Sequence, residues 1–229
     1  MQIIIDKKMP PGAKTLLLEY GSVLELSTSG IAYEAISGHP DIFFCLTPKG
    51  LVAAPNLPQD CSRTLNKRGI KFSFGDKAVG PKYPESAHYN AVISENFLIH
   101  RLDISDPGVL RHSETLEKIN VKQGYCRCNL IPLKDDHFIT SDLGIYNALS
   151  ENGLTVLYVL PDNIILPGFP NGFLGGTCGV WEDDIFFAGS LDYLSQADEL
   201  RAFLRHLGYN IVELYEGPLF DAGSILFIE

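Results

Sequence analysis

Four short polar turns constrain the fold of this chain more than any other feature of its sequence. Each turn joins two short runs rich in aromatic and branched apolar residues, a pattern typical of a β-hairpin. The turns lie at residues 47–50, 94–96, 134–136 and 182–184. Successive turns are separated by about one fifth of the 229 residues, so the sequence predicts a unit that repeats along the chain.

A helical segment and one more apolar strand follow each hairpin. The clearest helix is predicted over 194–208, where apolar side chains recur at helical spacing and Gly208 marks the end. A shorter helix is predicted over 142–153, and weaker helical patterns cover 57–69 and 105–119. The strands that follow are predicted at 70–74, 119–121, 154–160 and 210–215. The repeated unit is therefore strand, turn, strand, helix, strand.

The two ends of the chain supply the parts of a fifth unit. A strand over 2–6, a helix over 10–21 and a strand over 22–26 begin the chain, and a lone strand over 224–229 ends it. Pairing of the N- and C-terminal strands completes the fifth hairpin and leaves no open ladder edge. The sequence therefore predicts an α/β fold, a five-fold pseudosymmetric α/β propeller in a single domain over 1–229. The competing architecture is an ordinary layered α+β sheet.

Charge and apolar patterning exclude several classes of protein. The formal net charge is −10, which disfavours nucleic acid and anionic membranes because phosphate binding needs clustered Lys and Arg. The apolar run Ile3–Ile5 is shorter than the roughly 7–15 residues of a signal peptide, and no stretch approaches the ~20 apolar residues of a membrane helix. Five cysteines, without a secretion signal, predict reduced thiols and a cytoplasmic protein.

The propeller brings together the residues at the start of the first strand of each unit. These are His39, Asp41, His88, Asn90, Gln123, Cys126, Cys128, Gly175–Cys178, Asp221 and Ser224. Histidines, carboxylates, amides and thiols at one end of the molecule predict a polar site for a small-molecule ligand. Small residues such as Gly175 and Gly176 are also expected where strands crowd together.

The five-unit architecture resembles the pentein superfamily, the guanidine-modifying enzyme fold. The segments 33–44, 54–56, 122–129 and 172–179 together resemble an uncharacterised bacterial branch of that superfamily. The resemblance implies deiminases, hydrolases or amidinotransferases that act on guanidino compounds, or a non-enzymatic ribosome anti-association factor. In the enzymes, a cysteine at the start of the last Gly-rich strand attacks the guanidinium carbon, a His moves protons and carboxylates bind the guanidinium nitrogens. This chain has Ser224 in place of that cysteine.

Five residues carry the candidate chemistry. Cys178 is the candidate nucleophile, since a neighbouring His would stabilise its thiolate. His39 would be the general acid or base, and Asp41 and Asp221 would bind the cationic part of the substrate. Ser224 is a weaker nucleophile unless a base activates it. The alternative places Cys178 in the core as a small buried side chain, and His39 with Asp41 in a turn cap.

Amides and further thiols complete the predicted site. Asn90 and Gln123 would orient a ligand or satisfy buried backbone groups, and Cys128 would contact substrate. Cys126 and Cys128 would share one face of a strand, but a zinc site needs four ligands, usually with two to four residues between cysteines. We therefore expect no metal and no cofactor. The histidines expected to be solvated, away from the site, are His100, His112, His137 and His206.

Two functions remain open at this stage. The first is a pentein-like hydrolase- or deiminase-type enzyme for a guanidino or amidino small molecule. The second is a non-catalytic binding protein on the same fold, which the missing cysteine of the last strand favours. Nothing in the pattern predicts an oligomeric state.

Overall fold

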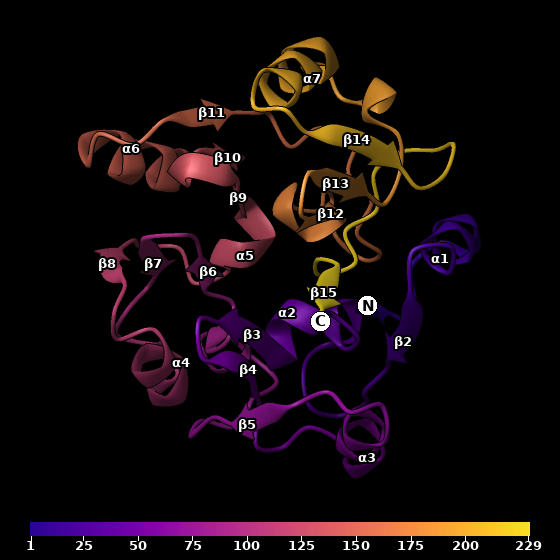
Figure 1. Cartoon of the computed structure of the whole chain (residues 1–229), viewed down its shortest axis with the longest axis vertical. Coiled ribbons are helices and arrows are strands. Elements are labelled where there is room, and N and C mark those ends of the chain that lie inside the picture. The colour runs from indigo at the N-terminus through magenta and orange to yellow at the C-terminus, as the bar shows by residue number, and fades with distance from the viewer.

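Five separate three-stranded sheets make up a mixed α/β fold in the structure, a computed structural model that describes residues 1–229. The sheets are β15-β1-β2 (Leu226–Ile228, Gln2–Asp6, Ser22–Leu26), β3-β4-β5 (Phe44–Thr47, Gly50–Ala53, Phe72–Phe74), β6-β7-β8 (Val92–Ile93, Phe97–His100, Glu117–Asn120), β9-β10-β11 (Leu130–Pro132, Phe138–Thr140, Val156–Tyr158) and β12-β13-β14 (Cys178–Trp181, Asp184–Phe187, Asn210–Glu213). In every sheet the first pair of strands is antiparallel and the second pair is parallel. Figure 1 shows the five sheets around a common centre.

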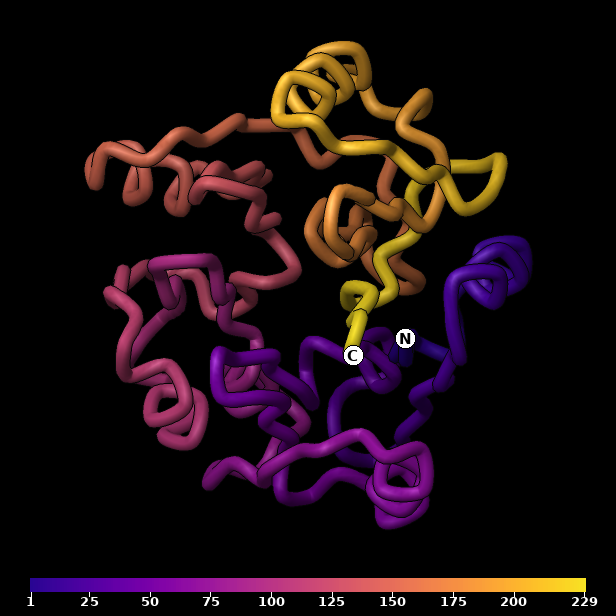
Figure 2. Tube along the Cα trace, viewed as in Figure 1, coloured from indigo at the N-terminus to yellow at the C-terminus, as the bar shows by residue number.

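A helix links the second and third strands of every sheet, because a parallel pair needs a crossover connection. These helices are α1 (Pro11–Leu17), α3 (Gln59–Lys67), α4 (Pro107–His112), α6 (Leu143–Glu151) and α7 (Ala197–His206). All five lie at the periphery (Figure 1), and the chain passes from sheet to sheet in sequence order around the molecule (Figure 2). The best-defined amphipathic helix, α7, buries Leu200 and Leu204 and ends before Gly208, whose φ is +78°. No helix is long and apolar enough to cross a membrane.

The two ends of the chain pair with each other, as the sequence predicts. β1 and β15 are antiparallel, with Gln2 opposite Ile228 and Ile4 opposite Leu226. Both termini therefore lie near the centre of the molecule (Figure 1). The predicted mixed α/β class is confirmed.

Short helical turns occupy the positions where three of the first strands were expected to begin. Helices α2 (Pro40–Phe43) and α5 (Cys126–Asn129) precede β3 and β9, and the 3-10 turn Gly175–Thr177 precedes β12. The prediction that Cys126 and Cys128 share one face of a strand is wrong, because residues two apart on a helical turn point in different directions.

His100 lies in the interior, so its expected solvation is also wrong. The ring is fully buried, with Nδ1 2.6 Å from Ser105 Oγ and Nε2 2.8 Å from the Gly124 carbonyl oxygen. Burial lowers the pKa of His100 to about 4. The neutral His100 ring, with both nitrogens hydrogen-bonded, therefore has a structural role at the end of β7. A charged imidazolium would be energetically costly at this buried position.

Candidate active site at the centre of the fold

A group of buried polar side chains lies where the helical turns and strand ends of four sheets meet, and we call it the central polar cluster. Its members are Asp6, His39, Asp41, Asn90, Cys128, Asp221 and Ser224. Every member is at most 4% exposed. Hydrogen bonds or close approaches of titratable atoms join these members across the chain.

Asp41, in the first turn of α2, is the hub of the cluster. Its Oδ2 accepts hydrogen bonds from Ser224 Oγ at 2.8 Å and from Cys128 Sγ at 3.2 Å. Asn90 donates to the backbone carbonyl of Asp41 at 3.1 Å and lies 3.3 Å from the Cys128 sulfur. The second oxygen, Oδ1, is buried without a partner. Burial raises the pKa of Asp41, and the hydrogen bonds to its carboxylate oppose that shift.

His39, the residue before α2, lies between two other carboxyl groups. Its Nε2 is 3.8 Å from Asp6 Oδ2, and its Nδ1 is 3.9 Å from Asp221 Oδ1. Burial lowers the pKa of His39 to about 3, so the ring is neutral near pH 7 and neither approach is an ion pair. His39 Nδ1 and Asp6 Oδ2 both lack hydrogen-bond partners. Unpaired buried atoms of this kind are costly and ask for a functional explanation.

Backbone N–H groups, rather than cations, hold Asp6 and Asp221 in place. Asp221 accepts from the N–H of Phe173 at 2.9 Å and of Gly223 at 3.1 Å, and Asp6 accepts from the N–H of Lys8 at 2.6 Å. Burial raises the pKa of Asp221 to about 7 and that of Asp6 to about 6. No Lys or Arg lies within 4.0 Å of the carboxyl oxygens of either residue. The cluster therefore contains buried acidic groups that form no ion pair with a Lys or Arg side chain.

Glycines let the backbone pack directly against the cluster. A methyl group in place of the Gly38 hydrogen would overlap the Asp6 carboxyl, and one at Gly176 would overlap that of Asp221. At Gly223 the same change would overlap His39. This close packing explains the small residues that precede β12 and β15, as the sequence analysis expected of a crowded centre.

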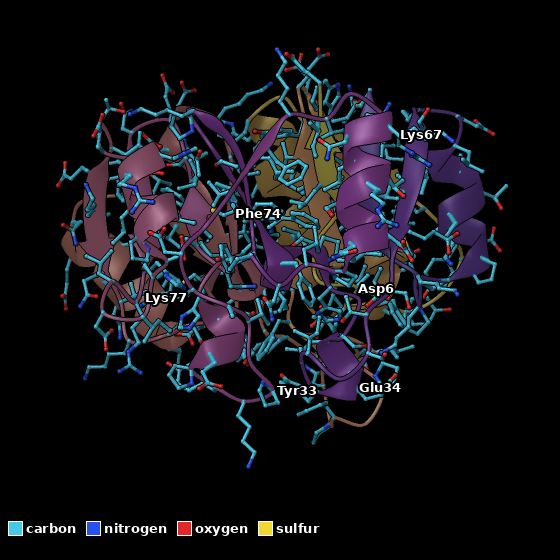
Figure 3. All side chains as sticks on the ribbon, turned by 90° about the horizontal axis from the view of Figure 1, so that it is seen from below. Asp6, Tyr33, Glu34, Lys67, Phe74 and Lys77 are labelled. Atoms are coloured by element: carbon cyan, nitrogen blue, oxygen red, sulfur yellow. The ribbon has the colours of Figure 1, made fainter.

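Two aromatic side chains lie beside the cluster at one end of the molecule. The rings of Tyr33 and Phe169 are 5.8 Å apart, although 136 residues separate them in sequence. In the side view of Figure 3, Tyr33 and Glu34 lie at the lower edge of the molecule, with Asp6 above them. Asp221 accepts a hydrogen bond from the backbone N–H of Phe173, which lies in the same loop as Phe169. The loop before β12 therefore contacts both Asp221 and the segment before α2.

The structure places two predicted site residues outside this hydrogen-bond network. Cys178 packs in an apolar cluster with Leu174 and Phe187, and its thiol donates a hydrogen bond to the Gly175 carbonyl oxygen at 3.7 Å. Burial raises the pKa of Cys178 to about 11, so its thiol is neutral near pH 7. The expected partnership with His39 is absent because the side chain points into the core.

Gln123 is engaged elsewhere. Its amide donates to Asp142 Oδ2 and accepts from the N–H of Tyr125, each at 3.0 Å. These contacts anchor the start of α6 and the approach to α5, which is the backbone-satisfying role that the sequence left open.

Asp6 belongs to the cluster although it was not selected from the sequence. It ends the apolar run of β1, and β1 pairs antiparallel with β15. The last residue of a strand lies beside the first residues of its antiparallel neighbour. The carboxylate of Asp6 directly after the apolar run Ile3–Ile5 was therefore the sequence signal for this site residue. The pairing of β1 with β15 is what places that carboxylate near the start of β15.

No group of three His, Cys, Asp or Glu side chains in the chain is arranged to hold a metal ion. The cluster instead contains the carboxyl groups of three aspartates and the neutral imidazole of His39. Two donors, the Ser224 hydroxyl and the Cys128 thiol, share one oxygen of Asp41. Such a set can bind a cation through hydrogen bonds and can move protons among Asp41, Ser224 and Cys128.

A family model described as "Family of unknown function (DUF6873)" matches residues 4–226. Comparison with the sequences of curated proteins found no match. Among solved structures, the chain is similar to DDAH from Pseudomonas aeruginosa, a mutant complexed with citrulline, with a TM-score of 0.56 and 8% identity over 93% of this chain and 91% of that one.

Two further solved structures have a similar fold. SxtG, an amidinotransferase from Microseira wollei, has a TM-score of 0.53 and 12% identity, covering 92% of this chain and 87% of its own. The C. jejuni agmatine deiminase has a TM-score of 0.53 and 9% identity, covering 92% of this chain and 74% of its own. These similarities confirm the resemblance to the pentein superfamily at the level of the fold.

Proposed function

This chain belongs to the family of unknown function DUF6873, and we propose that it is a hydrolase- or deiminase-type enzyme that binds a guanidino or amidino small molecule at the central polar cluster. One observation carries the proposal: three buried carboxyl groups, of Asp6, Asp41 and Asp221, have no cationic side chain as a partner. A planar cation with several N–H donors would satisfy them, because carboxylates accept paired hydrogen bonds from such groups. The solved structures with this fold include guanidine-modifying enzymes.

The roles follow from the contacts of each residue. Asp41 and Asp221 bind the cationic group, with Asp6 as a further acceptor, and Asn90 holds Asp41 and Cys128 in place. His39 is neutral and has a free Nδ1, so it can accept a proton from a bound group. Ser224 already donates to Asp41 Oδ2, which makes it the nucleophile that the geometry favours over Cys178.

In the proposed step, the Ser224 Oγ forms a bond to the central carbon of the substrate while its proton passes to Asp41. The bond from that carbon to the leaving nitrogen then breaks, and the nitrogen takes up the proton. A water molecule attacks the remaining intermediate and restores the Ser224 hydroxyl. Cys128 donates to the same oxygen of Asp41 at 3.2 Å and is the second candidate for this role.

Calorimetric binding of arginine, agmatine and guanidinium, compared with neutral citrulline, tests the site. Cationic ligands should bind more tightly at pH 8 than at pH 5, because carboxyl groups with pKa values of about 6 and 7 ionise between these values. Asp221→Asn should weaken binding about tenfold or more, since charged hydrogen bonds contribute roughly 1.5–3 kcal/mol. The matched control is Asp60→Asn on the exposed face of α3. Equal affinity for citrulline and the cations would contradict the proposal.

Release of ammonia or amine tests catalysis separately. Ser224→Ala and Cys128→Ala, assayed side by side, identify the nucleophile as the variant that abolishes product formation while binding is retained. Tight binding without product in the wild type would instead identify a non-catalytic binding protein on this fold.

We also infer that the five sheets are the blades of a five-fold pseudosymmetric α/β propeller, and that residues 1–229 are one domain. The identical strand pairing in all five sheets supports this inference. All five cysteines are free thiols, as a cytoplasmic location would favour.

A further inference from the structure

A cavity lies among the first strands of the five sheets, and Asp41 is the only one of its lining residues that the proposed function uses. Its volume is about 390 Å³, within the range of roughly 300–1,000 Å³ typical of small-molecule sites. The first strand of every sheet contributes to its wall. These contributions include Phe44, Ile93, Pro132, Val180 and Phe227. The wall is therefore mostly apolar and is built jointly by all five sheets.

Arg127, in α5, provides the positive charge in this apolar cavity. Its guanidinium donates to the Gly175 carbonyl at 3.0 Å and to the Cys178 carbonyl at 3.2 Å. A guanidinium has five N–H donors, so these contacts leave donors free. No carboxylate lies within 4.0 Å of Arg127, in contrast to Arg101, Arg111 and Arg201. The side chain is half-buried, and although its charge acts on the pKa of Asp41, it forms no ion pair.

Asp41 also lines the cavity, but its carboxyl is directed to the central polar cluster through Oδ2. At the outer side, Leu46 is 44% exposed although it is a large apolar side chain. The cavity thus combines guanidinium donors with an apolar wall and an apolar rim. This distribution suits a ligand that has an anionic group and an apolar body.

We propose that this cavity binds a small monocarboxylate with an apolar chain, whose carboxylate accepts hydrogen bonds from Arg127. The apolar chain would lie against the first strands, and its far end would reach Leu46. The site is separate from the proposed guanidino site in its ligand chemistry, since one recognises an anion and the other a cation. Failure of one proposal leaves the other standing.

The single tryptophan of the chain provides a direct readout. Trp181 lies 6.1 Å from Phe227, measured between ring centroids, and Phe227 lines the cavity. Titration with octanoate should change the Trp181 fluorescence with saturation. Octan-1-ol and octylamine are the matched neutral and cationic probes, and we expect each to bind about tenfold or more weakly, since charged hydrogen bonds outweigh neutral ones.

Arg127→Gln should weaken octanoate binding about tenfold or more and leave octanol unchanged. Arg111→Gln, an exposed arginine of α4, should leave both unchanged. Leu46→Glu changes only the rim of the cavity and serves as the test if Arg127→Gln fails to fold. It should weaken the binding of octanoate and strengthen the binding of octylamine. Equal binding of octanoate and octanol, tighter binding of octylamine, or insensitivity to both Arg127→Gln and Leu46→Glu would overturn the proposal.

Discussion

Asp221 accepts two backbone hydrogen bonds, yet burial raises its pKa from the ordinary 3.8 to about 7. The folded protein therefore holds a proton on Asp221 more tightly than the unfolded chain does. The stabilisation from this proton is complete below pH 3.8 and is lost as the pH rises through 7. The full difference amounts to about 4 kcal/mol. His39 acts in the opposite sense, because its pKa is lowered to about 3 and its destabilising effect grows as the pH falls below 6.5.

Replacing Asp221 by Asn should flatten the dependence of stability on pH. Between pH 5 and pH 8 the wild type should lose about 2–3 kcal/mol of unfolding free energy that the variant does not lose. Urea unfolding at both pH values measures the difference, with Asp60→Asn as the exposed control. An unchanged slope in Asp221→Asn would show that Asp221 does not carry a raised pKa.

Ser224 combines a hydrogen bond with a strained backbone. Its φ is +73°, in the left-handed region that favours glycine, and its hydroxyl bonds Asp41. Strain at a buried polar residue is typical of functional sites.

Two substitutions of Ser224 separate the strain from the hydrogen bond. Ser224→Ala and Ser224→Gly both remove the hydroxyl, but only alanine keeps a Cβ in the left-handed region. We expect the glycine variant to be more stable than the alanine variant by about 1 kcal/mol, as measured by urea unfolding. The reverse order would argue against backbone strain at this position.

At the scale of elements, local pattern predicted most strands and helices, because hairpin turns and amphipathic spacing are local properties of sequence. The starts of the first strands were missed. At Pro40–Phe43 and Cys126–Asn129 no turn signal separates the segment from the apolar strand that follows it. Only the folded centre requires a helical turn there, which brings Asp41 and Cys128 together. The site could be predicted only in part for the same reason: Asp6 acquires its role through pairing with the other end of the chain.

Three peripheral helices end in the same way. Gly69, Gly153 and Gly208 follow α3, α6 and α7 with φ values of +75°, +77° and +78°, and a Cβ at any of them would meet no atom within 4 Å. After α7, the N–H of Tyr209 bonds the carbonyl of Leu204 at 3.0 Å, which completes a glycine-dependent helix end.

Gly208→Ala should therefore destabilise the protein through backbone conformation alone. The expected loss is about 1 kcal/mol, because alanine adopts a left-handed conformation less readily than glycine. Asn tolerates the left-handed region better than Ala does, so Gly208→Asn should lose less stability than Gly208→Ala. Thermal unfolding of the two variants in parallel gives the comparison, and a fully stable Gly208→Ala would contradict the assigned helix end.

At the scale of the whole molecule, the joining of β1 and β15 has the same strand pairing as the four continuous hairpins. Those hairpins connect their strands by short turns, such as Pro48 and Lys49 between β3 and β4. The fifth lacks only a covalent link between Glu229 and Met1. If the five units are equivalent, packing of the sheets should not depend on which hairpin carries the chain ends.

A circular permutant tests this equivalence. Joining Glu229 to Met1 by a short glycine-rich turn, and opening the chain between the exposed residues Pro48 and Lys49, moves the break from the fifth hairpin to the first. We expect native near-UV circular dichroism and an unfolding free energy within about 2 kcal/mol of the wild type, since closing one short loop and opening another nearly cancel in entropy. Opening the chain instead between Val52 and Ala53, both fully buried in β4, should prevent folding. If the permutant opened at Pro48 also failed to fold, the fifth hairpin would differ from the others in what it contributes to folding. The five units would then not be equivalent.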